Sequence, residues 1–279
     1  MVAVKTQALY NEILEAIESN KLPIPSQPEI ATELQEVVND PGVTVEDLCK
    51  IIKKDPGLTA RILRLANSPL VRGRVPIQGL DNAIARMGVG FVGNLAIGLA
   101  LEQMFKTSNK LIAQRMNAAW EHCSYVACIC SALAVQNTKL PVDQAMLAGV
   151  LHEIGILSIL SFAEKHPEIL TDEQTLDKII ETHSAKLSQA IMTAWQFAPE
   201  LRSIPVELYD YYLKKDKADL ADTLLVAKIY ALDDTTHPLA KLNRAELPAF
   251  KRLGLDPKKS LDHYSELKEA VDLARELLG

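Results

Sequence analysis

The stretch LAGVLHEIGIL, residues 147 to 157, places a histidine and a carboxylate side by side in an otherwise apolar segment. Imidazole nitrogens and carboxylate oxygens are common ligands of divalent metal ions, and such an ion can activate water for phosphoester cleavage. His152 and Glu153 are therefore candidate metal ligands. The stretch does not match the HExxH zinc-protease pattern, because position 156 is isoleucine where that pattern has its second histidine.

Residues of these types also have purely structural interpretations. A histidine in an apolar helix is more often buried and hydrogen-bonded to a neighbour than bound to a metal. His183 precedes the segment SAKLSQAIM, where we expect a helix to begin and the histidine to cap it or to make a structural hydrogen bond rather than to take part in catalysis. Trp120 and Trp195 are expected in the core. The four cysteines show no CxxC spacing, which indicates buried reduced thiols rather than a zinc or redox motif.

Length and composition describe an ordinary globular chain. With 279 residues, 48% of them hydrophobic, it can form one large domain or two smaller ones around a sizeable core. No stretch approaches the roughly 18 uncharged apolar residues of a membrane span, and charges interrupt the N-terminal segment. We therefore expect a cytoplasmic protein without a membrane partner.

The charge of the chain is unevenly distributed. The net charge of −6 argues against general nucleic-acid binding. Between Lys50 and Arg86, eight basic residues face two acidic ones, which gives +6 there and leaves −12 for the rest. This window is either a solvated helix surface or a docking surface for an acidic partner or a phosphate. In the second case the first candidates are Arg61, Arg64, Arg72 and Arg74.

Apolar residues recur at helical spacing along nearly the whole chain, and strand-like alternation is absent over any useful length. We expect about a dozen helices and no sheet. Thr44 with Asp47, and Asp55 before Pro56, are typical of helix N-termini. The glycines between residues 87 and 105 predict close helix packing, because no strand or Lys-Ser/Thr pair supports a phosphate loop. A break at residues 105–110 divides the chain into subdomains 1–108 and 109–279.

Several motifs in order resemble one family. They are the proline-punctuated opening LPIPSQPEI, then VNDPGVTVEDLCKIIKKDPGLTARILRLANS, AIARMG, WEHCSYVACICSALA, AMLAGVLHEIGILSIL, HSAKLSQAIMTAWQFAPEL and LPAFKRLGLD. Together they resemble the HDOD domain, the HD-related output domain of bacterial signalling proteins. The resemblance implies an all-α fold of two packed helical subdomains, of which the C-terminal one is HD-domain-like and related to HD-type phosphohydrolases. It also implies a role in signal transduction, often without catalysis.

The same resemblance assigns site residues. His122 in WEHCS matches the first family histidine, and His152-Glu153 stands where the family has His-Asp. The terminal family aspartate falls near LLVAKIYAL, where this chain has Lys228, and Tyr209-Asp210 replaces a His-His pair of many relatives. A lysine ammonium about 4 Å from a metal ion would repel it by roughly 1 to 4 kcal/mol per unit charge product.

The sequence therefore favours a non-catalytic regulatory module that binds a signalling protein or a small anionic ligand such as a cyclic dinucleotide, and that needs no cofactor. The alternative is a metal-dependent phosphohydrolase acting on a nucleotide or a phosphorylated small molecule. In that alternative His122, His152 and Glu153 would hold a divalent metal ion.

Overall fold

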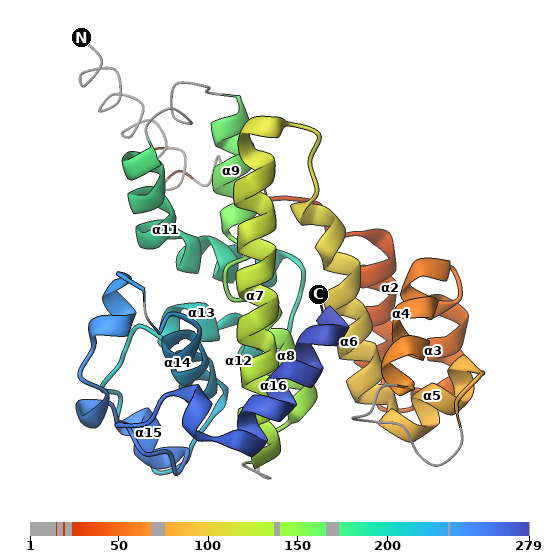
Figure 1. Cartoon of the computed structure of the whole chain (residues 1–279). Helices are drawn as coiled ribbons and strands as arrows, with labels where there is room; N and C mark the ends of the chain where they lie inside the picture. Colours follow the sequence, from red (N-terminus) through yellow and green to blue (C-terminus); the bar gives the residue numbers. More distant parts are fainter. Residues whose placement is uncertain are drawn as a thin grey trace.

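The computed structural model describes residues 24–67, 76–136, 140–165, 173–233 and 235–278, together with Glu15 and Ser19. All regular structure in these ranges is α-helix or 3-10 helix, and no strand occurs in them. The all-α prediction is therefore confirmed. Figure 1 shows two groups of helices, packed side by side, with the long helix α7 near the middle of the molecule.

The N-terminal group is a small bundle of short helices. It consists of α2 (Glu29–Val38), α3 (Val45–Ile52), α4 (Pro56–Ala66), α5 (Leu80–Met87), α6 (Val89–Leu101) and the 3-10 helix η1 (Glu102–Phe105). The predicted N-termini of two of these helices are confirmed. Thr44 and Asp47 form a capping box at α3, and the Asp55 side chain accepts a hydrogen bond from Leu58 N at α4.

Helix α6 is the central element of this bundle, and ten of its 13 residues are buried. A β-carbon on Gly93 would lie 2.2 Å from Val38 Cγ2, so α2 can approach α6 this closely only because residue 93 is glycine. On another side, Gly98 faces Val150 of α8, at 3.4 Å from its would-be β-carbon. Gly93 and Gly98 thus serve helix packing, as predicted, whereas Gly88 has φ 91° at the junction of α5 and α6 and, among the described residues beyond its chain neighbours, no atom within 4 Å of its would-be β-carbon.

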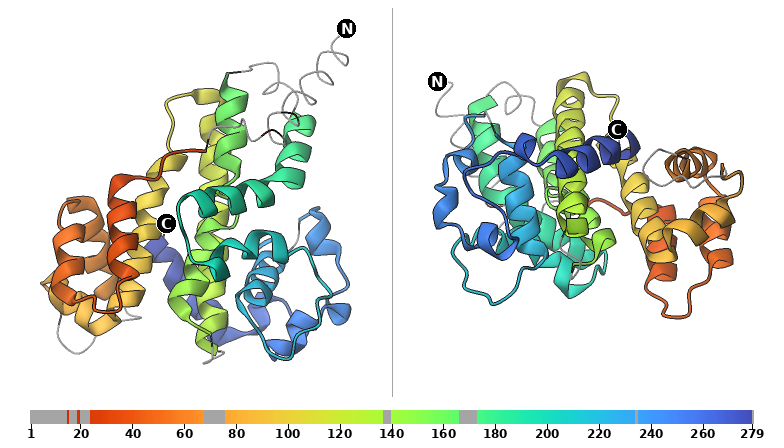
Figure 2. Two further views of the ribbon diagram at one scale, coloured as in Figure 1. Left: turned by 180° about the vertical axis from the view of Figure 1, so that it is seen from behind. Right: turned by 60° about the horizontal axis from the view of Figure 1, so that its bottom comes forward.

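The C-terminal group surrounds α7, and the views in Figure 2 agree on this arrangement. Helices α8, α9, α14 and α16 all contact α7. The elements of this group are α7 (Lys110–Gln136), α8 (Val142–Leu151), α9 (Ile156–Glu164), α11 (Glu173–Ala194), α12 (Pro199–Arg202), α13 (Ile204–Glu207), α14 (Leu220–Ala231), η2 (Pro238–Lys241), η3 (Arg244–Glu246), α15 (Pro248–Arg252), η4 (Leu261–His263) and α16 (Ser265–Leu278).

The two groups meet along α6 and α8, and α16 returns from the C-terminal group to contact α4. In Figure 1 the C-terminal end of α16 accordingly lies close to the N-terminal bundle. The chain passes from η1 to α7 between residues 105 and 110, at the position expected for the subdomain boundary. The division into 1–108 and 109–279 as separate folding units stays a prediction.

Two helical stretches, Ile112–Gln136 and Val142–Glu164, have the length and apolar composition of membrane spans, although each contains charged residues. The bent pair Leu80–Met87 with Val89–Phe105 passes the same test of length and composition. In the fold, 61% and 83% of the apolar windows of the first two stretches are buried against other parts of the protein. Their apolar character is thus largely used in the core.

The predictions about single residues of the core have different outcomes. Trp120 and Trp195 are buried, and all four cysteines are buried and unpaired, as expected. His183 does not begin a helix, because it lies in the middle of α11. The hydroxyl of the preceding Thr182 donates to Lys178 O, 2.7 Å away and one turn back, so the polar segment continues the helix instead of capping one.

Candidate functional site

Three candidate ligands come together in the C-terminal group. His122 projects from α7, while His152 and Glu153 lie in the turn between α8 and α9. One nitrogen or oxygen atom from each of the three lies within 4.8 Å of the others. The two imidazole rings are 5.7 Å apart between centroids and tilted by 54°. The structure therefore brings together the residues that the resemblance assigned.

Close approach of α7 and α8 makes this meeting possible. A β-carbon on Gly149 would lie 2.3 Å from Ala127 Cα and 2.7 Å from Ala127 N, which are backbone atoms that cannot rotate away. Real carbon contacts are about 3.5 to 4.0 Å. Only glycine therefore lets α8 approach α7 closely enough for His152 to reach His122.

The turn that carries Glu153 is held from outside by α11. Gly155 N donates a hydrogen bond to Ser188 Oγ at 2.9 Å, and a β-carbon on Gly155 would lie 2.2 Å from Ser184 O. These contacts leave no room for a side chain at residue 155. Gly149 and Gly155 were not among the predicted site residues, although each lies within three residues of the His152-Glu153 pair in the sequence.

The orientation of His152 is fixed by a backbone hydrogen bond. Its Nδ1 lies 2.7 Å from Gly149 O, and because a carbonyl oxygen can only accept, Nδ1 carries the proton. The hydrogen-bond partner of His152 Nδ1 is thus a backbone carbonyl one turn earlier in the chain. Nε2 is buried, has no hydrogen-bond partner among the described residues, and lies 3.6 Å from Glu153 Oε1.

A fourth side chain reaches the same place from α14. Lys228 Nζ lies 2.6 Å from Glu153 Oε1 and donates a hydrogen bond to it. The side chains of Lys228 and Glu153 are only 2% and 19% exposed. Lys228, which belongs to the segment where the resemblance places an acidic ligand, is thus hydrogen-bonded to the carboxylate of the group.

The pair carries full and opposite charges. Burial alone would lower the pKa of Lys228, but the Glu153 carboxylate attracts the ammonium and holds that pKa above its ordinary value. Burial alone would likewise raise the pKa of Glu153, but Lys228 and the two nearby imidazoles hold it well below its ordinary value. Both groups are thus ionised at neutral pH.

The two histidines are neutral under the same conditions. Burial, reinforced by His152 and Lys228, lowers the pKa of His122 to about 4 against the partial opposition of Glu153. Burial and the Lys228 ammonium also lower the pKa of His152. The buried group therefore holds one positive charge, one negative charge and two neutral imidazoles, and its net charge is zero.

A divalent metal ion fits this set of donors poorly. The single carboxylate of the set, Glu153, already accepts a hydrogen bond from Lys228. An ion placed among the three donors would therefore lie beside the Lys228 ammonium. At about 4 Å, the repulsion amounts to roughly 1 to 4 kcal/mol per unit charge product in a partly wet site. A metal ion bound to Glu153 would therefore lie close to the Lys228 ammonium unless Lys228 moved away or lost its proton.

Other residues around the group supply no further ligand in the part of the chain that the structure describes. Tyr209 is 39% exposed, with its ring centroid 6.2 Å from that of Tyr211, and Asp210 is exposed. Half-buried His237 uses Nδ1 to accept a hydrogen bond from Leu239 N at the start of η2. Burial and the nearby Lys228 lower the pKa of His237.

Two of the four predicted docking residues, Arg61 and Arg64, lie in α4 of the N-terminal bundle. Arg61 is half-buried and forms an ion pair with Glu102, which also binds Lys106 at 2.7 Å. Arg64 of the same helix is exposed. Arg72 and Arg74 lie outside the described residues. The prediction that these arginines bind an acidic partner is untested, and Arg61 already has an acidic partner within the chain.

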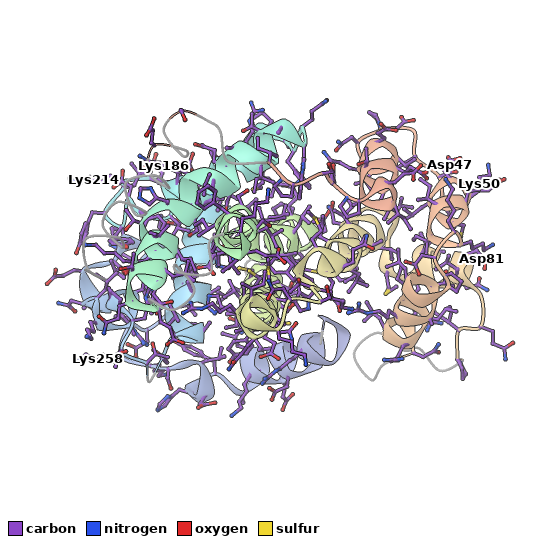
Figure 3. The ribbon with its side chains drawn as sticks, turned by 90° about the horizontal axis from the view of Figure 1, so that it is seen from above. Asp47, Lys50, Asp81, Lys186, Lys214 and Lys258 are labelled. Carbon is purple, nitrogen blue, oxygen red and sulfur yellow. The ribbon has the colours of Figure 1, made fainter. Side chains whose placement is uncertain are left out.

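Acidic residues from outside the basic window neutralise other members of it. Lys54 Nζ lies 2.5 Å from Glu33 Oε2, and Lys50 Nζ lies 3.2 Å from Glu46 Oε1. Figure 3 shows the side chains of Asp47 and Lys50 close together at one end of the molecule, with Lys186, Lys214 and Lys258 toward the other end. The formal +6 of the window therefore overstates its positive potential.

The protein has an HD-like arrangement of helices: α7 is the long central helix, the turn between α8 and α9 carries a histidine and a carboxylate, and α14 faces that turn. The HDOD domain model matches residues 24–209, and the chain belongs to the HDOD family. This confirms the family that the sequence motifs indicated.

Solved structures of similar proteins cover almost the whole chain. A protein of Shewanella amazonensis SB2B, named "Putative metal-dependent phosphohydrolase", is 26% identical with a TM-score of 0.83, and the match covers 98% of this chain and 99% of that one. An HDOD domain protein of unknown function from Geobacter sulfurreducens is 18% identical, with a TM-score of 0.66 and coverage of 99% and 98%.

A third structure, a "Putative signal transduction protein" of Marinobacter aquaeolei VT8, is 19% identical with a TM-score of 0.63; the match covers 98% of this chain and 66% of that one. Among curated proteins, an uncharacterized protein of Treponema pallidum (strain Nichols) is 24% identical over 174 residues. That alignment covers 61% of this chain and 31% of the Treponema protein, so the chain matches only about a third of that relative.

Proposed function

We propose that this HDOD protein is a non-catalytic signalling module whose function is to bind a protein partner. The observation that carries the proposal is the buried ion pair between Lys228 Nζ and Glu153 Oε1, 2.6 Å apart. The ammonium holds the carboxylate that a metal ion would need, and a hydrolase of this type depends on the metal to activate water. The family supports a signalling role.

A small anionic ligand is less favoured than a protein partner. The buried group has no net charge and so does not attract a polyanion. A cavity between α4 and η1 is lined by Arg61 and Lys106, but its volume of about 180 Å³ is below the roughly 300 Å³ typical of small-molecule sites. A larger cavity of about 540 Å³ is lined by Glu200, Glu207 and Asp219, whose charges oppose an anion.

The test of non-catalysis measures metal content and turnover together. We expect purified protein to contain no stoichiometric iron, manganese, nickel or magnesium by elemental analysis. We also expect no hydrolysis of bis(p-nitrophenyl) phosphate when any of these ions is added. Stoichiometric metal together with turnover that is lost in His152→Ala would contradict the proposal.

The partner is tested with Arg64, an exposed arginine of the basic window. Interaction partners captured by the full chain should be lost with Arg64→Glu and retained with the control Lys258→Glu. Both changes reverse one exposed positive charge, and Lys258 lies toward the other end of the molecule (Figure 3). Equal capture by both variants would remove Arg64 from the docking surface.

A second candidate function, metal-dependent phosphohydrolysis, is supported by two observations. Three donors lie within 4.8 Å of one another, and the protein from Shewanella amazonensis with a TM-score of 0.83 bears the name of such an enzyme. For this candidate, His122, His152 and Glu153 would hold the ion once Lys228 had moved away. The elemental analysis and turnover assay above distinguish the two functions.

A further inference from the structure

We infer that the Lys228 ammonium is a built-in substitute for a metal ion, and that it joins α14 to the turn between α8 and α9. This inference rests on the proposed absence of metal catalysis and adds a structural role for the replaced ligand. In this proposal Lys228 holds Glu153 in place through a hydrogen bond and contacts no substrate.

The first support is geometric. A metal ion in a helical site connects side chains from separate helices through one shared cation. Lys228 comes from α14, and its partner Glu153 lies 75 residues earlier in the turn after α8. The ammonium therefore connects α14 to the turn between α8 and α9, as a metal ion bound by side chains of both would. Unlike a metal ion, it is covalently part of one of the two elements.

The second support is the balance of charge. Glu153 is the only carboxylate among the three candidate ligands, and Lys228 places one ammonium 2.6 Å from its Oε1. The pair is neutral without any ion from solution. A divalent ion would leave a net charge of two in a buried place, and such a charge is costly unless further anions surround it.

The third support is the burial of the lysine. Every residue of α14 from Ala221 to Tyr230 is buried, and Lys228 is among the largest fully buried side chains of the protein. A buried ammonium without a partner is strongly destabilising. Its hydrogen bond to Glu153 is therefore a condition for α14 to occupy its place in the fold.

The experiment uses the full chain and four variants, with thermal unfolding in the presence of EDTA or millimolar manganese(II). Wild-type protein should have the same Tm in both. Glu153→Gln leaves the buried Lys228 ammonium without a partner and should lower Tm by about 10 °C. Lys228→Met leaves the half-buried Glu153 carboxylate without its cation and should also lower Tm, by less. The double variant Lys228→Met/Glu153→Gln leaves neither charge and should recover most of that loss.

The decisive variant is Lys228→Asp, which adds a second carboxylate to two imidazoles and Glu153. We expect manganese(II) to raise its Tm by several degrees and elemental analysis to find about one bound ion per chain. The matched control is Lys228→Met, which removes the same ammonium but adds no donor, and its Tm should respond much less. This readout does not depend on enzymatic activity.

Three outcomes would overturn the inference. They are a Tm of Lys228→Met equal to that of wild type, no recovery in the double variant, and no gain of metal binding by Lys228→Asp. Each of these can occur while wild-type protein contains no metal and shows no turnover, so the inference can fail while the proposed function stands. Metal-dependent turnover by wild-type protein would contradict both.

Discussion

Gly149→Ala is the sharpest test of how the site is assembled, because one methyl group would enter a contact between two helix backbones. The new β-carbon would lie 2.3 Å from Ala127 Cα, whereas carbon atoms in contact are about 3.5 to 4.0 Å apart. Helices α7 and α8 would have to separate locally by roughly 1.5 Å. His152, three residues further on, would be displaced from His122.

The expected change in the free energy of unfolding of Gly149→Ala is the sum of two opposing contributions, overpacking of the core and improved helix propensity. Overpacking a well-packed core costs typically about 1 to 3 kcal/mol, and a backbone contact that cannot rotate away lies at the upper end of that range. Replacing glycine by alanine in a helix returns about 1 kcal/mol. We therefore expect a net loss of about 2 kcal/mol, which lowers Tm by roughly 4 to 8 °C for a chain of this size.

The matched control is Gly98→Ala in α6, which is also a buried helix glycine. Its β-carbon would lie 3.4 Å from Val150 Cγ2, near ordinary contact distance and against a side chain. This variant should have a Tm equal to or slightly above that of wild type. Thermal unfolding followed by circular dichroism measures both. A Gly149→Ala variant as stable as Gly98→Ala would refute the argument that this contact sets the spacing of α7 and α8.

Three further predictions concern titration, packing and reactivity. His122 should titrate near pH 4 in NMR spectra of the folded protein, whereas histidine in the unfolded chain has a pKa of about 6.5. The free energy of unfolding should therefore decrease as the pH falls from about 6.5 to about 4, by at most about 3 kcal/mol. This pH dependence should be smaller in His122→Gln. Arg252→Met leaves Asp222 buried without the guanidinium that binds both of its carboxylate oxygens, and it should lower the free energy of unfolding by about 3 to 5 kcal/mol. Arg252→Lys should recover only part of this loss in denaturant unfolding. An unchanged unfolding midpoint in Arg252→Met would contradict the prediction. All four thiols are buried, and burial raises the pKa of Cys128 to about 12. They should not react with Ellman's reagent in the native protein, and all four should react after unfolding. Fast reaction of the native protein would contradict their burial.

Local features of the fold could be predicted from the sequence because they depend on neighbouring residues. The caps at Thr44 and Asp55 follow from side chains that reach backbone groups three residues away. His183 shows the limit of that reasoning. A cluster of threonine, histidine and serine is typical of a helix start, but the Thr182 hydroxyl bonds within the helix and α11 continues through the cluster.

Contacts between distant residues could not be read from the sequence in the same way. The motif resemblance indicated that His122, His152 and Glu153 belong together and that Lys228 falls near them. It did not indicate a hydrogen bond from Lys228 to Glu153, because only the packing of α14 sets that distance. The sequence likewise indicates Arg61 as a candidate docking residue, but it does not indicate the ion pair of Arg61 with Glu102, 41 residues away on η1.

The buried charges of α14 have a further consequence for how the fold is specified. Apolar contacts are not directional, so a helix that is buried on all sides is not oriented by its hydrophobic pattern alone. Two ionised residues of α14 make specific bonds: Asp222 with Arg252 of α15, and Lys228 with Glu153 of the turn. A rotation or shift of α14 would break both bonds and leave their charges buried. A buried ion pair is often no more stabilising than an apolar pair of similar volume, but it penalises other arrangements strongly. We therefore attribute to these two pairs the unique orientation of α14, and through it the position of Lys228 where a metal ligand would otherwise be.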